Sequence, residues 1–212
     1  MTTLFRPACV LFVCFSLLTG IAYPLVITGI AQLLFPRQAN GTVLLRDGKP
    51  SGSSLIGQEF STGRHAAAYF WSRPSATSPV AYTPFNADKL TGSSGSNLAA
   101  TNPALIENVK ARVDALKEAD AAAGYERPAS TTIPVDLVTS SASGLDPHIS
   151  AASAEYQLPR VAKARNITES QLRELVGAHT QKRQFAILGE PAVNVLELNL
   201  DLDSRYPLRA IE

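Results

Sequence analysis

The sequence predicts an α+β soluble domain with one N-terminal transmembrane helix. Thirty consecutive residues between Arg6 and Arg37 carry no charge. The rest of the chain mixes helix-spaced and alternating apolar segments without a regular β-α-β rhythm, which is typical of α+β proteins. Its length of 212 residues suits one domain. The expected boundaries are a short N-terminal segment at 1–7, a membrane helix at 8–35 and an α+β domain at 36–212.

Composition excludes several classes of protein. The chain has 19 basic and 18 acidic residues, so bulk charge favours neither nucleic acid nor another polyanion as a partner. Both cysteines, Cys9 and Cys14, lie within the apolar run. Nothing downstream can therefore form a disulfide framework or a cysteine metal site.

The apolar segment 8–34 is long enough to cross a bilayer as one helix. A buried core helix would need a polar face, and a cleaved signal peptide has a shorter apolar stretch and a small-residue cleavage site. We therefore expect an uncleaved anchor. Ser16 and Gly20 form a small-xxx-small pair that favours close helix packing, and Pro24 is tolerated in membrane helices.

Charge patterning gives a weak answer for orientation. Arg6 precedes the span, whereas Arg37, Arg46 and Lys49 follow it. A count of basic residues slightly favours a cytoplasmic carboxyl side.

The first half of the domain has strand and loop signals. Residues 43–45, the pair Asp47-Gly48 and residues 53–60 predict a hairpin, because Asp-Gly adopts the positive φ angles of a tight turn. Residues 68–71 form a further apolar segment, for which we expect a strand. A proline-rich loop of about thirty residues follows and includes TGSSGSN at 91–97, and loops of this length usually have a function.

Helix signals dominate the second half. Asn102 and Pro103 start a helix, as cap and first residue. Ser150 caps a second segment, in which Pro159 is expected to begin or kink a helix. Thr168 and Gln171 form a capping box for another helix. Alternation of leucines with polar residues over 196–203 predicts a final strand with one buried face.

Chemical motifs are few. The chain contains no GxxxxGK[ST], GxGxxG, HExxH or GxSxG sequence. Asp146 and His148 could orient a general base or hold a metal, and with Ser141 or Ser143 they are the basis of an alternative hypothesis, a membrane-anchored extracytoplasmic hydrolase. A simple turn before the next helix explains the same residues more economically.

Two further segments have both a functional and a structural interpretation. Tyr69, Trp71 and Arg73 could form a binding hot spot, but core anchoring with Arg73 bonded to loop carbonyls is favoured. TGSSGSN could bind phosphate through backbone amides, although such sequences more often form plain loops. Residues 151–179 resemble a helix-turn-helix, but Glu169 and Glu174 would repel phosphates, so no nucleic acid is expected.

Seven sequence blocks together resemble one family over nearly the full length. They are the span ending in Tyr23-Pro24-Leu25; Gly57-Gln58 with Phe60; YFWSRPSA (69–76); SNLAATNP (96–103); PVDLVTSSASGLDPHIS (134–150); Gln157 with RVAKAR (160–165); and LGEPAVNVLELNL (188–200). The chain is similar to the C subunit of the bacterial Kdp potassium-transporting P-type ATPase. It departs from the family at Ser94, in place of a glycine, and at Ala99-Ala100, in place of Gly-Pro.

The resemblance implies a non-catalytic subunit in the cytoplasmic (inner) membrane, with residues 1–7 in the cytoplasm and the domain outside it. Its partners would be a potassium-translocating subunit, a P-type ATP-hydrolysing subunit and membrane lipid. The family is described as a catalytic chaperone that raises the affinity of the pump for ATP, and this description implies that ATP could bind in a transient ternary complex with the chain. An exterior domain cannot touch cytosolic ATP, so a firmly bound cofactor is not expected and coupling would run through the membrane helices.

The blocks also select candidate residues. No catalytic or metal-binding residue is expected. We expect Ser16, Gly20 and Pro24 to pack against partner helices. The candidate partner or functional contacts are Tyr69, Trp71, Arg73, Ser96, Asn97, Asn102, Asp146, His148, Gln157 and Arg160.

Overall fold

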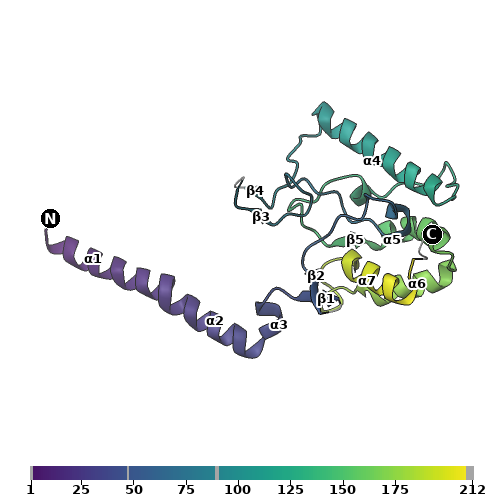
Figure 1. Ribbon diagram of the computed structural model, residues 1–212. Helices are drawn as coiled ribbons and strands as arrows, with labels where there is room; N and C mark the ends of the chain where they lie inside the picture. The colour runs from purple at the N-terminus through teal and green to yellow at the C-terminus, as the bar shows by residue number, and fades with distance from the viewer. Residues whose placement is uncertain (1, 47, 89–90, 209–212) are drawn as a thin grey trace. The chain divides into compact units, whose positions relative to one another are not determined.

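The structure is a computed structural model that describes residues 2–46, 48–88 and 91–208. Its contacts divide the chain into two units, Met1–Ser53 and Ser54–Glu212. Helices and small antiparallel sheets occur together, which confirms the predicted α+β class (Figure 1).

The first unit contains the apolar helix. Among the described residues, one helix, Leu4–Leu34, is long and apolar enough to cross a membrane, and none of it is buried. Its parts are α1 (Thr2–Leu17), a π-helical turn (Leu18–Ala22) and α2 (Tyr23–Leu34). Pro24 explains the π turn, because a proline lacks the N–H and crowds the carbonyl four residues earlier, and a wider turn relieves both problems. Ser16, Gly20 and Pro24 follow one another at four-residue spacing, so they share one face.

A hairpin follows the apolar helix. After α3 (Pro36–Ala39), β1 (Val43–Arg46) pairs with β2 (Lys49–Ser53) in antiparallel fashion. The expected hairpin is present, but its second arm is 49–53 and not 53–60. Gly48 has φ +74°, the positive value expected for a tight turn. Asp47 itself lies outside the described residues.

The second unit is built around a three-stranded sheet and four helices. The sheet order is β5-β7-β6, with both pairs antiparallel. The elements in chain order are η2 (Ala66–Ala68), β3 (Phe85–Asn86), β4 (Thr91–Gly92), α4 (Pro103–Ala122), η3 (Val135–Leu137), β5 (His148–Ser150), α5 (Ala151–Arg165), α6 (Glu169–Ala178), β6 (Thr180–Gln181), β7 (Ala192–Asn194) and α7 (Val195–Arg205).

Two hydrophobic cores share α5. Leu158 and Val161 of α5 pack with apolar side chains of α6, α7 and the sheet. Tyr156, on the same helix, packs with Trp71 and with Leu116 of α4. Helix α5 therefore contributes side chains to both cores.

The capping predictions are confirmed. Asn102 accepts a hydrogen bond from the Ala104 amide at the start of α4. Ser150 caps α5, and Thr168 forms the capping box of α6 with Gln171. These side chains satisfy amides that a first helical turn leaves without partners.

Three predictions for local structure are wrong. Pro159 does not begin a helix, because it lies inside helix α5, which runs from Ala151 to Arg165. Residues 68–71 form no strand: η2 is followed by an extended segment without a strand partner. The alternating segment 196–203 is helix α7. Its buried residues, Val195, Leu196, Leu198, Asn199 and Leu202, follow helical spacing, and the Asn194 side chain caps the helix.

Candidate functional site

Buried amide side chains hold the extended segment around Phe70 and Trp71. Asn199 of α7 accepts a hydrogen bond from the Phe70 amide at 3.0 Å and donates to the Phe70 carbonyl at 2.9 Å. Gln157 of α5 does the same for Trp71, at 2.8 and 3.1 Å. A side-chain amide offers a donor and an acceptor like a peptide group, so these two residues take the place of a neighbouring strand.

Arg160 holds the preceding turn. It donates to the carbonyls of Ala66 and Ala67 at 3.2 and 2.7 Å, and its guanidinium lies 4.9 Å from the ring of Trp71. The side chain is fully buried, and this burial lowers the pKa of Arg160 to about 10 despite the nearby Asp120 carboxylate. Arg160 and Gln157 are thus fixed parts of the core.

A second arginine of α5 fixes Tyr69. Arg165 donates to the Ala68 carbonyl at 2.9 Å, pairs with Asp203 of α7 at 2.8 Å, and lies 4.7 Å from the Tyr69 ring. The Tyr69 hydroxyl donates to the other Asp203 oxygen at 3.1 Å. Burial and the Asp203 carboxylate raise the pKa of Tyr69. The sequence analysis did not select Arg165 or Asp203 as site residues.

Trp71 is buried in the second core. Its side chain packs with Leu116 and Tyr156, and its indole N–H donates to the Ala66 carbonyl at 2.8 Å. This position agrees with the favoured interpretation, in which Trp71 anchors the core. The same segment brings Arg73 into a separate polar network.

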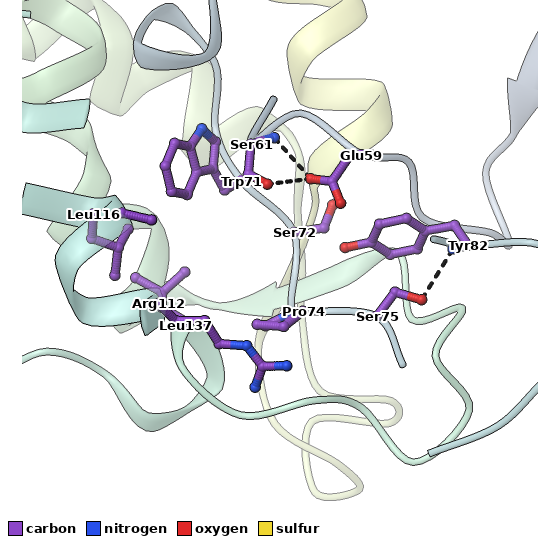
Figure 2. Close-up of a pocket in the computed structure, with 11 residues that line it drawn as sticks. Glu59, Ser61, Trp71, Ser72, Pro74, Ser75, Tyr82, Arg112, Leu116 and Leu137 are labelled. Carbon is purple, nitrogen blue, oxygen red and sulfur yellow. Dashed lines mark hydrogen bonds between the residues drawn. The ribbon is translucent and has the colours of Figure 1, made fainter. Parts of the chain in front are cut away.

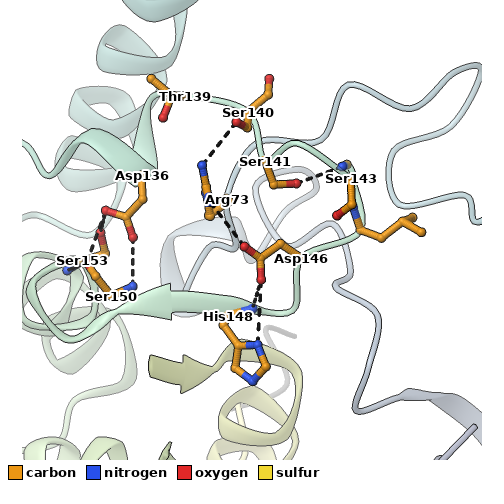
Figure 3. A network of polar contacts seen from close by, with 12 residues as sticks. Arg73, Asp136, Thr139, Ser140, Ser141, Ser143, Asp146, His148, Ser150 and Ser153 are labelled. Atoms are coloured by element: carbon orange, nitrogen blue, oxygen red, sulfur yellow. Dashed lines mark hydrogen bonds and ion pairs between the residues drawn. The ribbon is translucent and has the colours of Figure 1, made fainter. Parts of the chain in front are cut away.

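A polar network, which we call the loop clamp, consists of Arg73, Asp146 and His148 (Figure 3). Arg73 pairs with Asp146 at 3.3 Å and donates to the Ser140 carbonyl at 3.2 Å. The Asp146 carboxylate accepts a hydrogen bond of 3.0 Å from the backbone amide of His148. The same carboxylate lies 3.8 Å from the His148 Nδ1 atom. The clamp ties the segment after Trp71 to the start of β5, and the expected bond from Arg73 to a loop carbonyl is present.

The same geometry does not favour a hydrolase. Ser141 accepts a hydrogen bond from the Gly144 amide, and Ser143 accepts one from the Leu145 amide. The Nε2 atom of His148 is buried and has no hydrogen-bond partner in the part of the chain that the structure describes. A serine nucleophile needs hydrogen-bond contact with its base, and neither serine makes that contact here.

Asp136 is a further polar residue, partly buried, whose role the sequence did not indicate. It accepts hydrogen bonds from the Ser150 amide and from the hydroxyls of Ser150 and Ser153 (Figure 3). Burial alone would raise the pKa of Asp136, but these hydrogen bonds outweigh it, and the pKa lies below its usual value. Asp136 therefore fixes the junction between η3 and the cap of α5.

The loop at 91–97 packs tightly against residues 142–144. A Cβ atom on Gly95 would lie 2.8 Å from the Ala142 carbonyl oxygen, and one on Gly144 would lie 2.6 Å from the Ser94 carbonyl oxygen. The Ser94 amide donates to the Ser143 carbonyl at 2.9 Å. The amide of Ser94 is thus used inside the fold, which weakens the phosphate-binding interpretation.

Ser96 and Asn97 follow this contact and are exposed. Asn97 adopts a left-handed conformation with φ +51°, which asparagine tolerates better than most residues. The turn presents both side chains to solvent. The structure thus separates Ser96 and Asn97, on the surface, from Trp71, Gln157 and Arg160, in the core.

A cavity of about 220 Å³ lies between Trp71 and Arg112 (Figure 2). Arg112 donates to the Val138 carbonyl and the Ser140 hydroxyl, at 2.9 and 3.0 Å, and burial lowers its pKa. Burial and the Glu59 carboxylate raise the pKa of Tyr82 on the opposite wall. Arg112 thus helps to hold the turn at 138–140, a role that no sequence motif indicated.

Comparison with known proteins decides the family. Residues 5–204 match the model of KdpC, described as the K⁺-transporting ATPase, c chain. The chain belongs to the KdpC family. It is 54% identical over 208 residues to the potassium-transporting ATPase KdpC subunit of Methylibium petroleiphilum, covering 98% of this chain and 100% of the relative.

Other relatives agree over similar lengths. The KdpC subunit of Polaromonas naphthalenivorans is 52% identical over 210 residues, which is 99% of each chain. That of Paraburkholderia xenovorans is 55% identical over 203 residues, which is 96% of this chain and 97% of the relative. The resemblance seen in the sequence blocks is therefore confirmed.

Proposed function

We propose that this KdpC chain is a non-catalytic subunit that assembles and stabilises a high-affinity potassium uptake pump. Its direct partners would be the potassium-translocating and the P-type ATP-hydrolysing subunits. The observation that carries the proposal is full-length family membership, together with the use of the Asp146 and His148 pair as a structural clamp. This pair is the catalytic alternative that the sequence offered, and its carboxylate, on Asp146, is engaged with Arg73 and with the backbone amide of His148.

The apolar helix supplies a route for assembly in the membrane. Ser16, Gly20 and Pro24 share one face and offer little side-chain bulk, which allows a partner helix to approach closely. We expect this face to contact partner helices and the remaining surface to contact lipid. Ser96 and Asn97 are the exposed members of the loop blocks and are the proposed contacts of the domain.

The regulatory part of the proposal is that the subunit acts as a catalytic chaperone and raises the affinity of the ATP-hydrolysing subunit for ATP. With the domain outside the cytoplasm, contact between the domain and ATP is impossible. The chain would instead bind one conformation of the pump more tightly than another and shift its population. This mechanism needs no firmly bound nucleotide on the chain.

Cysteine labelling tests on which side of the membrane the domain lies. Ser170 is exposed at the start of α6, and both native cysteines lie in the apolar helix. We expect a Ser170→Cys variant, with Cys9 and Cys14 changed to serine, to react with a membrane-impermeant maleimide in intact spheroplasts. Labelling only after lysis would place the domain in the cytoplasm and contradict the proposed orientation.

Co-purification and growth test the assembly role. The full-length chain with its anchor should retain the two partner subunits in mild detergent, and its gene should be needed for growth in potassium-limited medium when the other pump genes are intact. Normal growth after deletion of the gene would contradict the role.

A further inference from the structure

The cavity between Trp71 and Arg112 has an apolar wall and two polar sides (Figure 2). Its volume of about 220 Å³ is below the range of about 300–1,000 Å³ that is typical of sites for drug-sized ligands, so it suits a molecule with few non-hydrogen atoms. Trp71, Leu116 and Leu137 line the cavity and are buried. A ligand that fits this cavity would therefore have a short apolar part between polar groups.

Arg112 forms the cationic side of the cavity. It is half-buried, and it donates to the Val138 carbonyl and the Ser140 hydroxyl. A guanidinium has five N–H donors, so these two bonds leave it capacity for a further acceptor. Among the described residues, Arg112 forms no ion pair with a carboxylate. A half-buried cation without an acidic partner favours a ligand that brings a negative charge.

Ser72 and Glu59 form the other polar side. The Ser72 hydroxyl is buried and has no hydrogen-bond partner in the part of the chain that the structure describes. A buried hydroxyl without a partner is unfavourable, so a ligand atom that pairs with it gains affinity. Figure 2 shows Glu59 and Ser72 on one side of the cavity and Arg112 on the other. A carboxylate beside a hydroxyl that can accept a bond favours a cationic N–H group at this side.

Tyr82 lines the cavity from a strained backbone. Its φ of +59° lies in the left-handed region, which a Cβ atom makes costly. A Cβ atom on Gly57 would lie 2.7 Å from the Tyr82 ring, so only a glycine there allows this ring position. The Tyr82 hydroxyl donates to the Arg73 carbonyl. Strain of this kind persists where the surrounding structure holds it, and it is frequent at ligand sites.

We propose that this cavity binds a short ω-amino carboxylate, a zwitterion whose ammonium and carboxylate lie at opposite ends of a short methylene chain. The ammonium would pair with Glu59 and donate to Ser72, and the carboxylate would pair with Arg112. The methylene groups would cover Trp71 and Leu116. An α-amino acid carries both charges at one end, so it would reach only one polar side. This inference goes beyond the proposed pump function and does not depend on it.

Equilibrium dialysis of the full-length chain in mild detergent against radiolabelled 4-aminobutyrate tests the proposal. We expect saturable binding of one molecule per chain. Unlabelled butyrate and butylamine each lack one charged end, and alanine carries both charges at one end, so each should compete at least about ten-fold less well than unlabelled 4-aminobutyrate. No saturable binding, or equal competition by any of the three, would overturn the proposal.

Substitutions separate binding from folding. Ser72→Ala removes a hydroxyl that has no partner in the described chain, so it should leave urea unfolding unchanged but weaken 4-aminobutyrate binding by about ten-fold. Glu59→Gln removes the exposed negative charge and should weaken binding to a similar extent. Ser204→Ala, an exposed change on α7, is the matched control and should change neither property. Unchanged affinity in folded Ser72→Ala or folded Glu59→Gln would overturn the proposal.

Discussion

Removal of one buried amide should destabilise the domain strongly, because Asn199 alone pairs both backbone groups of Phe70. Asn199 is 1% exposed, so water cannot replace its two hydrogen bonds. Each buried polar group left without a partner costs about 1–3 kcal/mol, so Asn199→Ala should lower the free energy of unfolding by about 2–6 kcal/mol. Asn199→Asp keeps the acceptor but loses the donor, and it should also be strongly destabilised.

The assay is urea unfolding of the full-length chain in mild detergent, followed by fluorescence of Trp71, the single tryptophan. Trp71 follows Phe70 directly and is buried, so its emission reports on the segment that Asn199 holds. Ser204→Ala, an exposed change on the same helix, is the matched control and should have almost no effect. A loss below about 0.5 kcal/mol for Asn199→Ala, within the range of surface substitutions, would refute the view that side-chain amides replace a strand here.

Burial and charge support further predictions. Trp71→Ala should destabilise the domain by about 3–5 kcal/mol, the usual cost of emptying an aromatic core site, in the same urea assay. Asn97→Ala should leave unfolding unchanged but weaken co-purification with the partner subunits, and normal assembly and transport would contradict its contact role. Leu18→Arg should shift the protein out of the membrane fraction, because a charge at the bilayer centre costs about 2.5–3.5 kcal/mol on insertion scales. Asp136→Asn should be less stable than the native chain at neutral pH. This difference should shrink as pH falls below about 4, since the lowered pKa of Asp136 stabilises the fold only while the carboxylate is ionised; a constant difference in acid unfolding would contradict this.

The sequence predicted best those features that depend on neighbouring residues. The caps at Asn102, Ser150 and Thr168 each require only one side chain and the next few amides, and all three are present. The apolar helix was equally clear, because an uncharged apolar run of this length is typical of a membrane-spanning helix. The family resemblance, carried by short blocks in order, is confirmed by the comparisons.

Features that depend on tertiary contacts were harder to predict. The leucines at 196, 198, 200 and 202 alternate as in a strand, yet Asn199 is buried with Val195, Leu198 and Leu202 on a helical face. An asparagine looked like a solvent-facing residue, because nothing nearby in sequence shows that its partner is Phe70. The segment at 68–71 was expected to pair as a strand for the same reason. Its partners are side chains of α5 and α7, more than eighty residues away in sequence.

The most direct test of the central claim is the KM for ATP of the pump with and without this chain. Membranes from cells that express the other pump genes would be compared with and without the full-length chain, at matched levels of the ATP-hydrolysing subunit. The account predicts a lower KM for ATP when the chain is present, with no hydrolysis by the chain alone. An unchanged KM in membranes where the chain is assembled with its partners would contradict the role in raising ATP affinity.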